Sequence, residues 1–129
     1  MHSLLMTALV VEALWELLRY DVVLRTGGFR RIHRSVRQVR LGDPSGDSRV
    51  ETHVLTAMRW ALSLYWKPAL CLQQSVATAR MCRRHGIGAA LVIGCRPEPF
   101  VSHAWVEIEG RVLNDSRVYQ QCLQILERV

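Results

Sequence analysis

The chain has 129 residues, half of them apolar, and a formal net charge of +6 at neutral pH. This length is enough for one domain with a single hydrophobic core, and the composition is ordinary for a compact globular protein. No uninterrupted run of about 20 apolar residues occurs, so no membrane span is expected. Sixteen of the seventeen basic residues are arginines. Arginine favours contact with carboxylates or phosphates, but charge alone does not name the partner.

The first half of the sequence predicts helices. Residues 4–24 have the periodicity of a helix that buries one wide face. The apolar residues of that face are Leu4, Leu5, Ala8, Leu9, Val11, Trp15 and Leu18. Gly27-Gly28 ends this helix, and residues 29–40 predict a shorter amphipathic one. A third helix begins at Ser48, which forms a capping-box pattern with Glu51.

The second half predicts one more helix and then short strands. Pro68 suits the first turn of a helix over about residues 69–85, and Gly86 is typical of a left-handed C-terminal cap. The predicted strands are residues 89–94, 102–108 and 111–115. Residues 119–129 form a weaker amphipathic element that we expect to be helical. The fold class is therefore α+β, in one domain over residues 1–129, with a helical part at 1–66 and a mixed part at 67–129.

Cys71 is the first candidate for catalysis. It falls in the first turn of its predicted helix, where unpaired backbone N–H groups and the positive end of the helix dipole stabilise a thiolate. The same amides suit an oxyanion hole. Taken alone, a cysteine in a helix is more often a small apolar core residue, and we expect that role for Cys82 and Cys122.

His103 and Asp115 complete the candidate set. A thiolate nucleophile needs an imidazole to carry protons and a carboxylate to orient that imidazole. In a strand over residues 102–108, His103 shares one face with Trp105 and Glu107. The hairpin that follows decides whether Asp115 meets His103.

Two hairpin registers are open. A two-residue turn pairs Ile108 with Arg111 and places His103 and Asp115 on opposite faces, which would remove Asp115 from the mechanism. A three-residue loop, with a glycine in the left-handed position of a bulge, pairs Glu107 with Arg111 and His103 with Asp115. We expect the second register, because it also sets opposite charges face to face.

Other cysteines and histidines give no comparable signal. Four cysteines without a secretory signal are expected to be reduced thiols in the cytoplasm. Cys82, His85, Cys95 and His103 are potential metal ligands, but they contain no Cys-x-x-Cys pair and match no usual zinc spacing. We therefore expect neither a metal nor a cofactor.

Arginines and tryptophans have less specific interpretations. The arginines of residues 25–40 form either a binding face or, by default, a solvated helix face. Nucleic-acid binding is not expected, because aromatic platforms and a recognisable motif are missing. Trp15, Trp60 and Trp66 are predicted to lie in helices as core or interface residues.

The order of a cysteine at a helix start, a His-Ala-Trp-Val-Glu strand, a hairpin and an aspartate resembles the transglutaminase-like branch of the papain-type cysteine enzymes. The finer pattern is similar to the leader peptidase of lasso-peptide biosynthesis, the stand-alone protease half of the split B-protein. The segments that carry the resemblance are Cys71-Leu72, Arg84-His85-Gly86-Ile87, Ala90-Leu91-Val92-Ile93-Gly94, Pro99-Phe100, His103-Ala104-Trp105-Val106-Glu107 and Gly110-Arg111-Val112-Leu113-Asn114-Asp115. The specific match covers residues 68–115. The helical first half shares the family's size and layout through weaker motifs.

The resemblance implies a minimal transglutaminase-like core with a nucleophile helix and a small antiparallel sheet. It implies that Cys71 is the nucleophile, His103 the general base and acid, and Asp115 the orienting group. In this family the peptidase removes the leader region of a ribosomal precursor peptide. A separate small recognition protein grips the leader, and an ATP-dependent lasso cyclase closes the ring.

The sequence thus predicts a cysteine peptidase that works through a thioester acyl-enzyme. On this reading Arg30, Arg34 and Arg37 dock the recognition protein and the leader. Two alternatives remain open. One is acyl transfer to an amine, as in transglutaminases and amidases, and the other is a catalytically silent binding module that has kept the fold.

Overall fold

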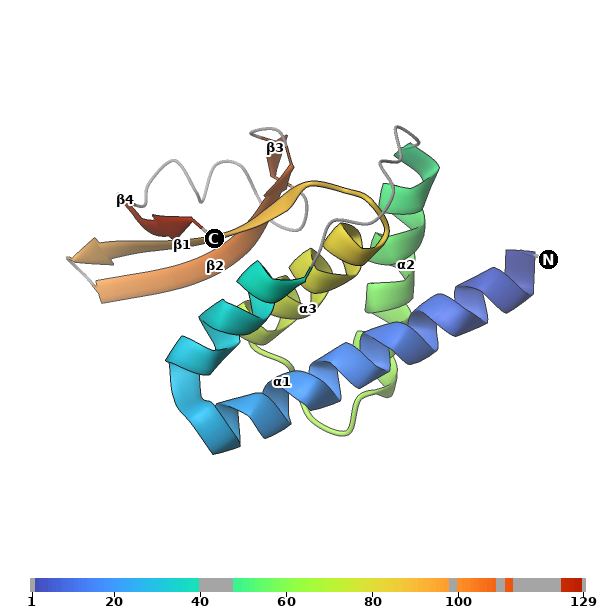
Figure 1. Cartoon of the computed structure of the whole chain (residues 1–129), viewed down its shortest axis with the longest axis horizontal. Helices are drawn as coiled ribbons and strands as arrows, with labels where there is room; N and C mark the ends of the chain where they lie inside the picture. The colour runs from blue at the N-terminus through green and yellow to red at the C-terminus, as the bar shows by residue number, and fades with distance from the viewer. Residues whose placement is uncertain (1, 40–47, 98–99, 109–110, 113–123, 129) are drawn as a thin grey trace.

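The computed structural model describes residues 2–39, 48–97, 100–108, 111–112 and 124–128. Within these residues, three helices pack against a four-stranded sheet (Figure 1). The helices are α1 (His2–Gln38), α2 (Ser48–Leu64) and α3 (Cys71–Arg84). The strands are β1 (Ala89–Pro97), β2 (Phe100–Ile108), β3 (Arg111–Val112) and β4 (Gln124–Arg128). This arrangement confirms the α+β class.

The predicted break in the first helix lies at Gly28. Gly28 has φ 68° and ψ −163°, which is not helical and which favours glycine, so α1 consists of two helical segments joined at this residue. Figure 1 shows the long first segment turning sharply into the shorter second one. The second segment buries Ile32 and Val36 and exposes arginines, so it is amphipathic as predicted.

The long segment of α1 buries the face opposite to the predicted one. Its buried residues are Leu9, Ala13, Glu16, Leu17, Tyr20, Asp21 and Val23. Of the predicted face only Leu9 is buried, whereas Leu4, Val11 and Trp15 are 60–75% exposed. The prediction was wrong because apolar residues follow a helical period on both sides of this segment, and period alone does not choose between them.

The three tryptophans of the helical half are not core residues. Trp15, Trp60 and Trp66 are 60–70% exposed, and Trp66 lies beyond the end of α2. Of the two predicted roles for these tryptophans, core residue or interface residue, only the interface role remains. None of the helices in the described residues has the length and apolar character that crossing a membrane requires.

Helix α3 is the centre of the molecule. It contacts α1 and α2 on one side and β1 and β2 on the other, as Figure 1 shows. Gln73 and every residue from Ser75 to Cys82 are buried. A helix buried around its whole circumference is typical of a core element. Gly86 follows the helix with φ 84°, which confirms the predicted left-handed residue at its C-terminal end.

The sheet has the order β3-β2-β1-β4, and the three strand pairs are antiparallel. Leu91 and Val106 pair with each other and contribute to the core beneath α3. Residues 124–128 form β4, which pairs with β1, so the predicted terminal helix is wrong for this segment. The free edge of β1 supplies backbone partners that outweigh a weak helical pattern.

Candidate active site at the start of α3

Cys71 is the first residue of α3, which confirms its predicted place in the first turn. Leu70 precedes it as an extended N-cap residue (φ −75°, ψ 167°) without a side-chain cap, and the Leu70 carbonyl accepts from the Gln74 amide at 3.0 Å. The first amides of the helix therefore have no intrahelical acceptor. Cys71 is a free, half-buried thiol that packs against the core. Cys71 thus belongs to the turn of the helix whose backbone amides lack an intrahelical acceptor.

The strand that carries His103 is fixed to α3 one turn after Cys71. Ser75 donates its hydroxyl to the Ala104 carbonyl at 3.1 Å, and the backbone of His103 pairs with buried Gly94 on β1. The chain is therefore held against the first half of α3 at the residue next to His103. The His103 side chain lies outside the described residues.

The hairpin after β2 has the register that was not expected. Ile108 pairs with Arg111 and Glu107 with Val112, so the predicted pairing of Glu107 with Arg111 is wrong. Arg111 instead lies 3.3 Å from a carboxylate oxygen of Glu51 on α2. This ion pair between β3 and α2 takes the place of the predicted cross-strand pair between Glu107 and Arg111, which had favoured the three-residue loop.

Asp115 lies outside the described residues, as does most of the strand predicted to carry it. A strand that continued in the observed register would place His103 and Asp115 on opposite faces, so this register counts against Asp115 as the orienting group. The assignment of Asp115 now depends on the family resemblance alone.

Trp105 and Glu107 share one face of β2, as predicted. The indole Nε1 of Trp105 donates to Glu107 Oε2 at 2.8 Å, and Trp105 is almost fully buried. Ala104, Val106 and Ile108 belong to the core cluster under the helices. The alternation within this strand is therefore established from residue 104 onwards.

Asp21 on α1 forms hydrogen bonds with residues that precede and follow Cys71 in the sequence. Its carboxylate accepts hydrogen bonds from the Tyr65 hydroxyl, from Lys67 Nζ at 2.7 Å and from Gln73 Nε2 at 3.1 Å. Tyr65 and Lys67 precede Cys71 and Gln73 follows it, so one buried carboxylate fixes the entry to α3 and its first turn. Burial opposes the charge, but these hydrogen bonds and the charge of Lys67 outweigh it, and the pKa of Asp21 is lowered.

Both glutamines of the first turn bind backbone carbonyls near the helix start. Gln73 Nε2 donates to the Leu17 carbonyl at 2.9 Å as well as to Asp21, so both of its N–H groups are used. Gln74 Nε2 donates one N–H group to the Ala69 carbonyl at 2.6 Å. The backbone amides of the first turn are therefore candidate oxyanion donors, and Gln73 is not.

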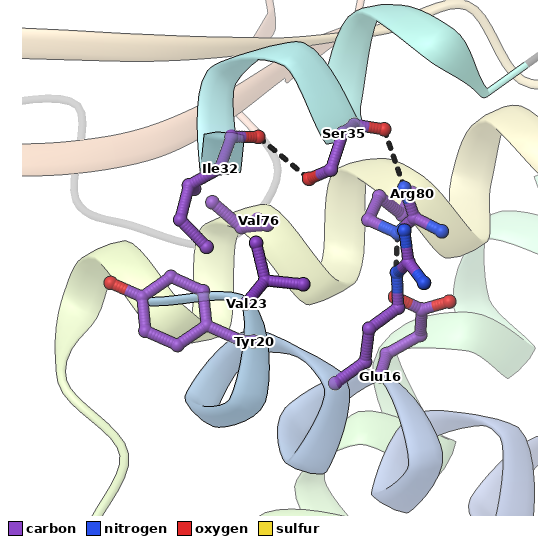
Figure 2. Close-up of a pocket in the computed structure, with 8 residues that line it drawn as sticks. Glu16, Tyr20, Val23, Ile32, Ser35, Val76 and Arg80 are labelled. Atoms are coloured by element: carbon purple, nitrogen blue, oxygen red, sulfur yellow. Dashed lines mark hydrogen bonds and ion pairs between the residues drawn. The ribbon is translucent and has the colours of Figure 1, made fainter. Parts of the chain in front are cut away.

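Tyr20 lies close enough to Cys71 for the two groups to interact electrostatically. Burial raises the pKa of the Tyr20 hydroxyl, and the charges of Asp21 and Cys71 raise it further. Figure 2 shows its hydroxyl pointing away from the Arg80–Glu16 pair. Tyr20 and Asp21 were not predicted as site residues, because the sequence pattern indicated that the other face of their helix is buried.

Comparison with known proteins places the chain in a family. Residues 14–127 match the Transglutaminase-like superfamily. The chain belongs to this superfamily. A stretch of 59 residues is 41% identical to the Microcin J25-processing protein McjB of Escherichia coli, and it covers 46% of this chain and 28% of McjB. The aligned part is thus less than a third of McjB, and no solved structure matches the chain significantly. These matches confirm the resemblance that the motifs indicate.

Beside α3 lies a charged cluster with a structural role. Glu16 is 1% exposed and pairs with Arg80 Nε at 2.7 Å and with Arg84. Arg80 also donates to the Ser35 carbonyl in the second segment of α1 (Figure 2). Arg19 lines the same small hollow, and burial together with the charges of Arg80 and Arg31 lowers its pKa. The cluster joins both segments of α1 to α3.

The predicted basic face lies on the second segment of α1. Arg30, Arg34 and Arg37 are all exposed, on the side away from buried Ile32 and Val36. Their exposure is compatible with docking, and nothing in the structure tests it.

Cys82 has the structural role expected of it. It is fully buried, and burial, with a contribution from the charge of Glu51, raises its pKa to about 12. Among the described residues no three cysteine, histidine or acidic side chains lie close enough together to hold a metal ion. Cys122 and the Cys95 side chain lie outside those residues.

Proposed function

We propose that this chain is a cysteine peptidase that removes the leader region from a lasso-peptide precursor. The observation that carries the proposal is a free, half-buried Cys71 at the first position of a core helix in a transglutaminase-like chain. The partial identity to a microcin-processing protein supports a peptide substrate. The expected setting is the cytoplasm, where a catalytic thiol stays reduced.

The reaction begins when the Cys71 thiolate attacks the carbonyl carbon at the end of the leader. The first-turn amides of α3 stabilise the negative charge that forms on the carbonyl oxygen. His103 gives a proton to the leaving amine, so the peptide C–N bond breaks and a thioester remains on Sγ. Water, deprotonated by His103, then attacks the thioester and releases the leader carboxylate and the free thiol.

In this scheme Asp115 orients His103, as the resemblance implies. The partners are the precursor peptide and a small leader-recognition protein that presents it. Arg30, Arg34 and Arg37 form the proposed docking face for that complex, because exposed arginines suit carboxylates on an acidic partner. No metal or nucleotide is required for these steps.

The mass of the products tests the proposal and separates it from acyl transfer. The purified chain is incubated with precursor peptide, with and without the recognition protein, and the masses of the products are measured by mass spectrometry. Hydrolysis yields two fragments whose masses add up to the precursor plus one water. Formation of a new amide with loss of ammonia would instead assign a transglutaminase-type acyl transfer to the same cysteine. An unchanged precursor in every combination would favour the silent binding module.

A further inference from the structure

The solvent-facing side of α1 carries an apolar stripe with the spacing of a coiled-coil seam. Its residues, at alternating intervals of four and three, are Leu4, Ala8, Val11, Trp15, Leu18 and Val22. All six are exposed, and the five larger ones are 44–75% exposed. A helix that packs only against its own core has polar residues on this side. The stripe, called the α1 seam below, therefore lacks a partner within the described chain.

We propose that the α1 seam binds the α1 seam of a second copy of this chain, in an antiparallel pair. The alternating intervals are those of the a and d positions of a heptad, which pack as knobs into holes. The α1 seam is also symmetric about the position of Ala13. Antiparallel pairing about that position gives three kinds of layer: Leu4 with Val22, Ala8 with Leu18, and Val11 with Trp15.

This pairing is self-complementary in size. Each layer joins a smaller side chain to a larger one, and the two-fold axis generates every layer twice, as an isologous interface requires. The central layers hold Trp15 against Val11, and the adjacent ones hold Leu18 against Ala8. Large side chains facing small ones allow two helices to interdigitate without voids.

The area is sufficient for a small specific dimer. The exposed fractions of the six side chains correspond to roughly 600 Å² of mostly apolar surface per chain, or roughly 1,200 Å² for the pair, at the lower end for stable interfaces. That area is also at the upper end for the largest apolar patch of a monomer. The paired side chains of the α1 seam include neither Cys71 nor His103, so the pairing is independent of the proposed peptidase activity.

One charge lies beside the α1 seam. The two-fold axis brings Glu12 near Glu12 of the other copy, which would oppose association if both carboxylates were free. Arg84 Nη1 lies 3.1 Å from one Glu12 oxygen and His85 Nε2 lies 3.0 Å from the other. These contacts offset the repulsion within each chain.

Sedimentation of the full chain at about 1–100 μM tests the proposal, a range chosen for the moderate affinity that such an area supports. We expect the wild type to show twice the 14.8 kDa chain mass. Trp15→Asp should weaken the dimer at least about tenfold while the circular dichroism spectrum stays unchanged. Trp60→Asp on α2 is the matched control, because Trp60 is 60% exposed and Trp15 61%. It should leave the dimer intact.

A charge swap tests the antiparallel register. Val11→Lys and Trp15→Glu should each weaken the dimer, and the double variant should recover it, because the introduced lysine of each copy then faces the introduced glutamate of the other. A parallel pair would instead set like charges together, so failure of the double variant to recover would overturn the register. A monomeric wild type at 100 μM would overturn the proposal. The proposal would also be overturned if the wild type were a monomer that binds another protein and Trp15→Asp abolished that binding, since the α1 seam would then bind a different chain.

Discussion

At the scale of single residues, the site is organised by a carboxylate that the sequence did not reveal. The positions of Cys71, Cys82 and Gly86 were predicted correctly, because they follow from the signals of a helix start, a helix interior and a helix end. Asp21 was not predicted, since its partners Tyr65, Lys67 and Gln73 are 44–52 residues away in the sequence. An acidic residue on an amphipathic helix is by default solvated, and only tertiary packing shows otherwise.

Replacing Asp21 should produce a pH-dependent loss of stability. The folded pKa of Asp21 is lowered, so its contribution is complete above the unfolded pKa of about 4 and is lost as the pH falls through the folded pKa. We expect Asp21→Asn to lower the free energy of unfolding by about 1–3 kcal/mol at pH 7, because buried donors lose a charged acceptor. The difference from the wild type should shrink below about pH 4.

Urea denaturation at several pH values measures this difference. Glu51→Gln is the control, since its ion pair with exposed Arg111 is 3.3 Å long and surface pairs contribute little. A deficit of Asp21→Asn that stays constant down to pH 2 would show that the charge of Asp21 does not stabilise the fold.

Asp115 needs a test that does not depend on the hairpin register. If Asp115 orients His103, Asp115→Asn should reduce the cleavage rate about 100-fold or more, with Tm unchanged, because an amide does not stabilise the imidazolium. Cleavage kinetics with the purified precursor measure the effect. A rate within about twofold of the wild type would remove Asp115 from the mechanism and leave Cys71 and His103 as the catalytic pair.

At the scale of helices and strands, prediction succeeded where local signals were strong. The break at Gly28, the start of α3 at Cys71 and the strands around 89 and 102 follow from glycine, proline and hydrophobic period. The register of β2 with β3 did not, because the cross-strand pairing of opposite charges on which the prediction depended contributes too little to fix a register. The strand β4 was missed because the edge of β1 supplies its partner.

Guanidinium groups of α3 complete the C-terminal end of α1. Arg80 donates to the Ser35 carbonyl, and Arg83 Nη1 donates to the Val36 carbonyl at 2.5 Å. The last carbonyls of a helix lack intrahelical donors and carry partial negative charge, so cations stabilise them. Helix α3 thereby fixes the segment that carries the exposed arginines.

Charge reversal on that segment tests the proposed docking face. Arg30→Glu, Arg34→Glu and Arg37→Glu together should weaken binding of the leader and recognition-protein complex at least about tenfold at low salt, and the loss should diminish as salt screens the charges. Calorimetric titration measures the affinity. Arg59→Glu, a single reversal at an exposed arginine on α2, is the control for a charge reversal outside the proposed docking face. Equal affinities for the triple variant and the wild type at low salt would move the docking site elsewhere.

At the scale of the whole molecule, the chain combines a buried central helix with large apolar side chains on its exterior. Helix α3 is enclosed by α1, α2 and the sheet, whereas α1 and the end of α2 expose large apolar side chains. The sequence predicted the helical half and the mixed half correctly. It did not predict which side of α1 is outside, because two apolar faces of one helix differ only in what packs on them.

The central claim, that Cys71 is the nucleophile of a peptidase, is tested most directly by cleavage of the precursor with Cys71→Ala. Cys82→Ala on the same helix is the matched control, because Cys82 is buried and has no part in the reaction. Mass spectrometry of the precursor after incubation should show two fragments with the wild type and with Cys82→Ala, and intact precursor with Cys71→Ala. Fragments formed by Cys71→Ala at the wild-type rate would contradict the account.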